Sequence, residues 1–419
     1  MYNGNISSMA VHNNALDADN LAGGQLLLYN YRYDQLNRIT GMDAYNGFDK
    51  INNHWQGLNQ LNIFKERIAY DANGNILKYL RHGHRPPFVM DSLSYHYYPG
   101  TNRLNHVTDQ VAAESFGNGQ NDVADIDNQN AGNYHYDEIG NLIKDLAEGI
   151  DKITWTVYGK IDSIEKASGT TIQYSYDPSG NRISKLVQRS TGDKNYTWYV
   201  RDAQGNVIAT YTAKGNATEL SDMELHLSER HHYGSSRLGI LAEEIDVDNN
   251  NKGPAEAEGE FAITYARGYR QYELSNHLGN VLVTVSDKKF GIDIDDDEEI
   301  DYFEPEIITA SDYYPFGMLM PGRGGSLING QWQESGPAVL ANLVVSSRNG
   351  NEPIEYIALE SIEFLPGFES GGADEFVAYI TTSGNGEGYE GEDGLYRYGF
   401  NGKENDKETG TQDYGFRIY

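Results

Sequence analysis

Residues 174–183 read Tyr-Ser-Tyr-Asp-Pro-Ser-Gly-Asn-Arg-Ile, and this short pattern decides how the chain folds. In a strand, Tyr-x-Tyr places two rings on one face because successive side chains alternate. The aspartate then starts a turn by accepting hydrogen bonds from backbone N–H groups two and three residues ahead. Gly-Asn supplies the positive φ angles that a tight hairpin requires. The pattern therefore predicts a β-hairpin.

The same unit recurs along the chain, with weaker copies at residues 95–104, 155–161, 198–207 and 272–281. Its clearest copies share a tyrosine, an aspartate and, in most, a glycine: Tyr33 and Asp34; Tyr70, Asp71 and Gly74; Tyr136, Asp137 and Gly140; Tyr176, Asp177 and Gly180. A single hairpin is barely stable, so the units must stack and bury their aromatic faces on one another. We interpret the tyrosines as core or wall residues and the aspartates as turn formers. The rival interpretation is that the aromatic faces bind carbohydrate.

Composition supports this prediction and excludes several classes of function. The chain of 419 residues has 46 glycines and 32 tyrosines, which favour tight turns and short strands. Its net charge of -30 argues against nucleic acid and anionic membranes as partners. It contains no cysteine, which removes disulfides, cysteine-based zinc sites and cysteine nucleophiles. No apolar run reaches the roughly 18 residues of a membrane-spanning helix, and the first residues do not form a signal peptide.

Several segments in the second half carry a family likeness. They are residues 233–239 (Tyr-Gly-Ser-Ser-Arg-Leu-Gly), 277–281 (His-Leu-Gly-Asn-Val), 313–318 (Tyr-Tyr-Pro-Phe-Gly-Met), 398–404 (Tyr-Gly-Phe-Asn-Gly-Lys-Glu) and 413–419 (Asp-Tyr-Gly-Phe-Arg-Ile-Tyr). Together with the repeats, they resemble the Rhs/YD-repeat proteins and the Rhs repeat-associated core region, in a form similar to that of Bacteroidota. The resemblance implies repeats that coil into a hollow β-shell around a variable C-terminal domain, often a toxin.

The resemblance also has gaps. Asn276 stands where the family usually has Asp, and Leu282 stands where Arg is common. The family pattern continues after the last segment into a self-cleavage motif, whereas this sequence ends at Tyr419, so no autoprotease residue and no toxin domain can be carried over. We therefore expect a fragment of a longer secreted or cell-surface protein.

The predicted fold is all-β, with hairpins coiling into a curved or spiral sheet and a small β-solenoid-like insert. Four parts are predicted. Residues 1–232 form the repeat array, and residues 233–323 form a core-like β segment with an acidic loop at 291–304. Residues 324–392 form the inserted β module, and residues 393–419 begin the terminal core motif.

The acidic loop is the one candidate metal site. Residues 293–304 place oxygen ligands at the spacing of an EF-hand-like calcium loop: Asp293, Asp295, Asp297, Asp301 and Glu304. Glu298 stands where such a loop has glycine for its sharp turn. Both a Ca²⁺ site and a solvated acidic loop therefore remain open.

No catalytic constellation is evident. The only adjacent histidines, His231 and His232, point to opposite faces of a strand, and no His-Glu-x-x-His, Gly-x-Ser-x-Gly or Walker A sequence occurs. We predict a non-catalytic shell of a polymorphic toxin with no cofactor other than calcium. Its expected partners are a C-terminal effector domain of the longer chain and secretion or injection machinery. The alternative is a cell-surface adhesin or carbohydrate-binding repeat protein.

Overall fold

The structure is a computed structural model. It describes the chain except for a set of short segments: residues 1–3, 14–25, 50, 85, 112–125, 127, 217–219, 248–266, 295–298, 329–330, 335–341, 346–354, 359–360, 365–376, 381–395, 407, 410 and 414–419. Apart from single turns of 3₁₀ helix at η2 (Leu220–Asp222) and η3 (Phe400–Gly402), the regular structure of the described residues is β. No helix in this part of the chain is long and apolar enough to cross a membrane.

The first sheet has eight antiparallel strands. They are β1 (Ser8–Val11), β2 (Leu27–Tyr33), β3 (Ile39–Asp49), β4 (His54–Gln60), β5 (Glu66–Tyr70), β6 (Ile76–His82), β7 (Val89–Tyr97) and β8 (Leu104–Asp109). Neighbours in sequence pair with each other, except that β4 folds back on β3, which also pairs with β5.

The second sheet has sixteen strands and continues the same meander. Its first half is β9 (Tyr134–Tyr136), β10 (Leu142–Asp145), β11 (Ile150–Trp155), β12 (Ile161–Lys166), β13 (Thr171–Tyr176), β14 (Arg182–Gln188), β15 (Lys194–Arg201) and β16 (Val207–Gly215). Its second half is β17 (Leu225–Tyr233), β18 (Arg237–Leu241), β19 (Ile245–Asp246), β20 (Arg270–Ser275), β21 (Val281–Ile292), β22 (Tyr302–Tyr313), β23 (Leu319–Ile328) and β24 (Gln331–Glu334).

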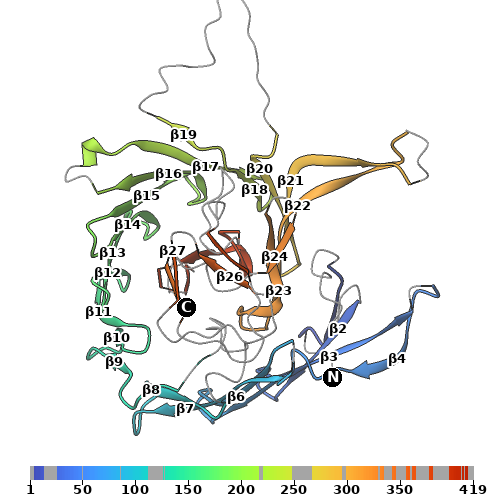
Figure 1. The fold of residues 1–419 in the computed structure, drawn as a ribbon. Helices are drawn as coiled ribbons and strands as arrows, with labels where there is room; N and C mark the ends of the chain where they lie inside the picture. The colour runs from blue at the N-terminus through green and yellow to red at the C-terminus, as the bar shows by residue number, and fades with distance from the viewer. Residues whose placement is uncertain are drawn as a thin grey trace, which may run out of the picture.

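The strands follow one another around an arc, and the C-terminal strands lie inside it (Figure 1). The two large sheets are not closed into a barrel by hydrogen bonds, because the first and second sheets are separate ladders. The predicted all-β fold of hairpins in a curved sheet is therefore confirmed. The long hairpin of β21 and β22 projects away from the arc (Figure 1).

Short parallel strands lie within the predicted insert. β25 (Asn342–Val345) pairs with β27 (Ser361–Phe364), and β26 (Glu355–Ala358) pairs with β28 (Val377–Ile380). Strands β29 (Glu404–Asp406) and β30 (Thr411–Asp413) form a small antiparallel pair further on.

The repeated aspartate closes the hairpin turns. Asp34 and Asp202 accept the backbone N–H two residues ahead and Asp137 the one three residues ahead, as predicted. Bonds from the residue four positions ahead, which were not predicted, recur as well. The Asp177 carboxylate accepts hydrogen bonds from the backbone N–H of Asn181 at 2.9 Å and from its side-chain amide at 3.0 Å. Asp71 and Asp137 hold Asn75 and Asn141 in the same way. These bonds favour the ionised form, and the bonds from Asn181 hold the pKa of Asp177 below its ordinary value. Gly180 takes φ of +83°, in the left-handed region that suits glycine.

The repeated tyrosine links each hairpin to the one before it. The Tyr176 hydroxyl donates to the backbone carbonyl of Ile161 at 2.8 Å. The other links are Tyr33 to Ile6, Tyr70 to Ile39, Tyr97 to Ile76, Tyr233 to Val207 and Tyr313 to Val281. From Tyr70 onward, each acceptor is the residue at which the register of the preceding hairpin shifts. Such irregularities bend and twist strands, so the tyrosine bonds the wall where it curves.

Each unit contributes two strands, so the aspartate turns lie along one rim of the wall. Neighbouring turns are joined there: the Arg38 guanidinium donates to the Asp71 carbonyl at 3.1 Å, and the Arg103 guanidinium donates to the Glu138 carbonyl at 3.0 Å. The long β21–β22 hairpin leaves from the opposite rim.

The arc closes on itself through side chains, at a contact that we call the seam. The seam is the packing of β2, β3, β6 and β7 against the end of β22, the turn 314–318 and the start of β23. Its apolar core contains Leu27, Tyr29, Met42, Ala44, Ile63, Phe64, Met90, Tyr314 and Met320, all with less than a tenth of their surface exposed. The Tyr29 hydroxyl donates to the Asp312 carboxylate at 3.0 Å across the seam.

We predict that Tyr176→Phe destabilises the protein by about 1 kcal/mol, since it removes one hydrogen bond and keeps the ring. The measurement is the urea midpoint of unfolding, followed by circular dichroism. Tyr158→Phe is the matched control, because Tyr158 is 89% exposed and should leave the midpoint unchanged. Equal midpoints for both variants would contradict the role given to the tyrosine link.

Candidate functional site

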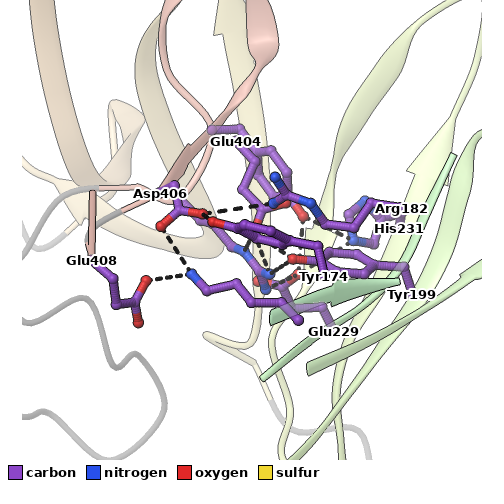
Figure 2. Close-up of polar contacts among 11 residues, drawn as sticks. Tyr174, Arg182, Tyr199, Glu229, His231, Glu404, Asp406 and Glu408 are labelled. Carbon is purple, nitrogen blue, oxygen red and sulfur yellow. Dashed lines mark hydrogen bonds and ion pairs between the residues drawn. The ribbon is translucent and has the colours of Figure 1, made fainter. Parts of the chain in front are cut away.

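A dense network of buried hydrogen bonds and ion pairs joins the C-terminal segment, residues 396–413, to the inner face of the second sheet. We call the wall side of this contact the seat. Its residues are Tyr174, Arg182, Lys185, Tyr199, Glu229, His231, Arg237, Glu273 and Asn280. Figure 2 shows Tyr174, Arg182 and Tyr199 of β13, β14 and β15 beside the carboxylates Glu404 and Asp406 of the C-terminal segment. Glu229 and His231 of β17 lie next to them and contact Arg397 and Tyr398 of the segment.

Backbone contacts fix the segment along β21. The backbone N–H of Val281 donates to the Gly399 carbonyl at 3.1 Å. The Asn280 side chain accepts the backbone N–H of Asn401 at 2.8 Å. Around these bonds, Tyr396 and Tyr398 pack into a buried cluster with Ile240, Ala242 and Val281. The segment therefore continues the hydrophobic core of the wall.

Arg397 is the centre of the first charged group. Its guanidinium donates to Glu229 at 3.1 Å and, through two nitrogens, to Glu404 at 3.0 and 2.6 Å. Glu229 also accepts the Tyr398 hydroxyl at 3.1 Å, and His231 Nε2 lies 3.3 Å away. Burial alone would raise the pKa of Glu229, but Arg397 and His231 hold it well below its usual range. Glu229 is therefore ionised and fully compensated.

Asp406 is the centre of the second group. Its carboxylate accepts the Tyr174 hydroxyl at 2.9 Å and the Lys185 ammonium at 3.2 Å, and Lys185 also contacts Glu408. Arg182 lies 3.8 Å from the same carboxylate. Burial opposes ionisation of Asp406, yet Lys185 and Arg182 lower its pKa. A carboxyl group with a lowered pKa stabilises the contact above its ordinary range and loses that contribution on acidification.

A third group holds the start of the segment. Arg237 pairs with Glu273 at 2.6 Å, and its guanidinium lies over the Tyr398 ring at 3.6 Å from the centroid. The Tyr396 hydroxyl donates to Glu273 at 2.7 Å, and Arg237 donates to the Gly402 carbonyl at 3.0 Å. Aromatic, ionic and backbone contacts thus converge on one arginine.

The ion pairs and hydrogen bonds of the seat bind the C-terminal segment to the wall. Each acid described above faces a cation, and a buried carboxylate left without one would be strongly destabilising. In the part of the chain that the structure describes, no group of three His, Asp or Glu side chains is placed to bind a metal. The absence of enzymatic activity remains a prediction.

The sequence predictions fall into two sets. The repeat residues Tyr33, Tyr70, Tyr136 and Tyr176 lie in the wall, and none of them belongs to the seat. The seat was not predicted. No motif in the sequence marks it, and the burial of Arg182 and Lys185 in β14, both less than a tenth exposed, is seen only in the structure.

Of the candidate calcium residues, Asp293 directly follows β21, Asp301 directly precedes β22, and Glu304 lies in β22. Asp295 and Asp297 lie outside the described residues. Asp301 accepts the backbone N–H of Ile294 at 2.8 Å, and Glu304 accepts the Tyr302 hydroxyl at 3.1 Å. The calcium site stays a prediction.

Comparisons with known proteins give limited information. No family model matches the chain, and no curated protein matches it. Among solved structures, it is similar to the chains described as "Crystal Structure of TcdB2-TccC3-TEV" and "Crystal Structure of TcdB2-TccC3-Cdc42", each at 13% identity and a TM-score of 0.33. The alignments cover 97% and 98% of this chain but only 16% and 17% of those chains. The proposals below therefore rest on contacts within this chain.

We predict that Lys185→Gln costs about 3 kcal/mol, because it leaves the buried Asp406 without its closest cation. Hydrogen exchange of the amides of residues 404–406 and the urea midpoint measure the effect. Lys152→Gln is the matched control: Lys152 pairs with Glu165, both side chains are about half exposed, and its loss should cost less than about 1 kcal/mol. Unchanged exchange in Lys185→Gln would contradict the role of the seat.

The two alternatives for the acidic loop, a calcium site and a solvated loop, make different predictions. If the loop is a calcium site, calorimetric titration with CaCl₂ should give a single saturable site, and the double variant Asp295→Asn with Asp297→Asn should weaken it at least tenfold, since two anionic ligands are lost. Glu243→Gln, outside the loop, should bind calcium like the unaltered protein. Absence of heat from the unaltered protein would exclude the site.

Proposed function

We propose that this chain is a wall segment of a Rhs/YD-repeat shell, and that its function is to hold its own C-terminal segment inside the wall so that an effector domain is enclosed or carried. The single observation that carries this proposal is the seat. A chain that merely coated a surface would have no need of a buried, charge-balanced site for its C-terminal segment. The wall itself contributes no catalytic step in this proposal.

The direction of the contact supports a container. The last strands described, β29 and β30, lie inside the arc (Figure 1). Glu404, Asp406 and Glu408 of the segment face Arg182 and Lys185 of the wall. A domain encoded after residue 419 would be tethered on this side. A toxin as that domain, and a secretion or injection machine that delivers the protein from the cell, are the finer parts of the same proposal.

The placement of the tyrosines favours the shell over an adhesin. An adhesin that binds sugars through aromatic faces needs a row of exposed rings on its outer surface. Four buried tyrosines among the described residues make hydrogen bonds inside the protein. Tyr29 and Tyr314 do so at the seam, and Tyr174 and Tyr199 bond Asp406 and Glu404. The exposed tyrosines among the described residues are Tyr158 at 89% and Tyr233, Tyr269, Tyr272 and Tyr302 at 36 to 43%, so four of the five keep more than half of their surface covered.

The test uses the absence of cysteine in the chain. Gln412→Cys and Ile300→Cys each introduce a single thiol, one in the C-terminal segment and one beside the projecting β21–β22 hairpin, where Ile300 is 57% exposed. Each variant reacts with a small maleimide and with a maleimide carrying a bulky polyethylene glycol. We expect the bulky reagent to react at least tenfold more slowly than the small one at residue 412 and at a similar rate at residue 300, because the proposal encloses only the first site. Equal ratios at the two sites would exclude the proposal.

A further inference from the structure

We propose that protonation of Glu66 stabilises the seam, so that the arc of strands is held closed most firmly when this carboxyl group carries a proton. We call this residue the proton-dependent lock of the seam. The inference concerns how the wall closes, and it holds whether or not the wall carries an effector.

The seam depends on a few side chains of the turn 314–318. The fully buried Tyr314 packs edge-on against Phe64, with ring centroids 6.4 Å apart, and its hydroxyl donates to the His82 carbonyl. Phe316 packs edge-on against Tyr79 at 5.7 Å. Met318 contacts the Arg81 guanidinium. The two sides of the seam lie more than 200 residues apart in the sequence.

Glu66 lies directly behind this contact. It has no exposed surface, and its Oε1 accepts the hydroxyl of Tyr79, the same ring that supports Phe316. Its Oε2 is buried and has no hydrogen-bond partner. A buried carboxylate with one uncompensated oxygen is costly, whereas a protonated carboxyl group carries no net charge. The position of the Tyr79 ring is therefore coupled to the protonation of Glu66. The packing of Phe316 against that ring is coupled to it as well.

Arg81 is the described cation that acts on Glu66, and its charge is largely engaged by another acid. Arg81, the closest arginine, is bound by Asp91 through two hydrogen bonds of 2.7 and 2.9 Å. Asp91 itself adds negative charge near Glu66. Burial raises the pKa of Glu66 to about 7, although the Tyr79 hydrogen bond and Arg81 oppose the shift.

The other titratable groups around the seam would not weaken it as the pH rises toward 7. Tyr31 on β2 has its pKa raised and stays neutral. Across the seam, Asp312 is paired with Arg323 at 3.0 Å and accepts the Tyr29 hydroxyl. Burial lowers the pKa of His82 from 6.5, so this histidine is neutral above that pH and opposes closure only in more acidic solution.

The sign of the effect follows from linkage. A carboxyl group whose pKa is raised on closure favours closure fully below its ordinary pKa of 4.5, and this contribution falls as the pH rises through about 7. If opening of the seam restores the ordinary pKa, the opening equilibrium constant rises on the order of a hundredfold between pH 5 and 9.

Hydrogen exchange of the whole protein tests the lock. Amides of residues 314–320 and 79–82 are followed between pH 5 and 9, with rates corrected for the intrinsic pH dependence of exchange. In the unaltered protein, we expect the opening constant at the seam to rise at least tenfold between pH 5 and 7 and to level off above that range, while β13 and β14 show no such rise. Glu66→Gln, which is neutral at every pH, should abolish the rise. Glu165→Gln, at an exposed position, is the matched control and should keep it.

A flat profile in the unaltered protein, or the same rise in Glu66→Gln, would overturn the proposal. If Glu66→Gln does not fold, Tyr79→Phe decides the matter. Loss of the hydroxyl removes a bond that favours the ionised carboxylate, so the midpoint of the rise should move to higher pH. An unmoved midpoint in Tyr79→Phe would overturn the proposal as well.

Discussion

The bond between a tyrosine hydroxyl and the backbone carbonyl of the preceding hairpin is the constraint on which the wall depends. An isolated two-stranded hairpin is marginal in water, and its outer edge offers unpaired groups. Here each tyrosine, such as Tyr70 or Tyr176, bonds the preceding unit at the residue where its register shifts. Curvature and cohesion thus arise at the same place. Every unit requires its neighbour, so the structure grows as an array.

The features that depend on residues close together in the sequence, the turns and the strands beside them, could be predicted. Asp177 and Gly180 define a turn within five residues, and alternation defines the strands on either side, so the hairpins and the all-β fold could be predicted. The tyrosines could be assigned to the wall but not to a particular carbonyl. That assignment depends on how two hairpins lie side by side, and the spacing between units varies too much to give it.

The seam and the seat could not be predicted for a different reason. Tyr29 meets Asp312 across 283 positions, and Tyr174 meets Asp406 across 232. Neither pair has a periodic signal, because each is created only when the arc has turned far enough to bring its ends together. Nothing in the sequence distinguishes Arg182 and Lys185 from exposed cations, and their burial becomes evident only in the structure. Buried pairs of this kind specify register and orientation more than they add stability.

The seat and the seam consequently respond differently to solution conditions. In the seat, Glu229 and Asp406 both face cations, and their pKa values are lowered. Both carboxylates therefore stay ionised, and the C-terminal segment stays bound, from neutral to moderately acidic pH. In the seam, Arg81 is committed to Asp91, and Glu66 is left to bind a proton. A rise in pH therefore weakens the closure of the wall while the segment stays bound. On the proposal made for Glu66, the wall opens along its seam before the C-terminal segment leaves the seat.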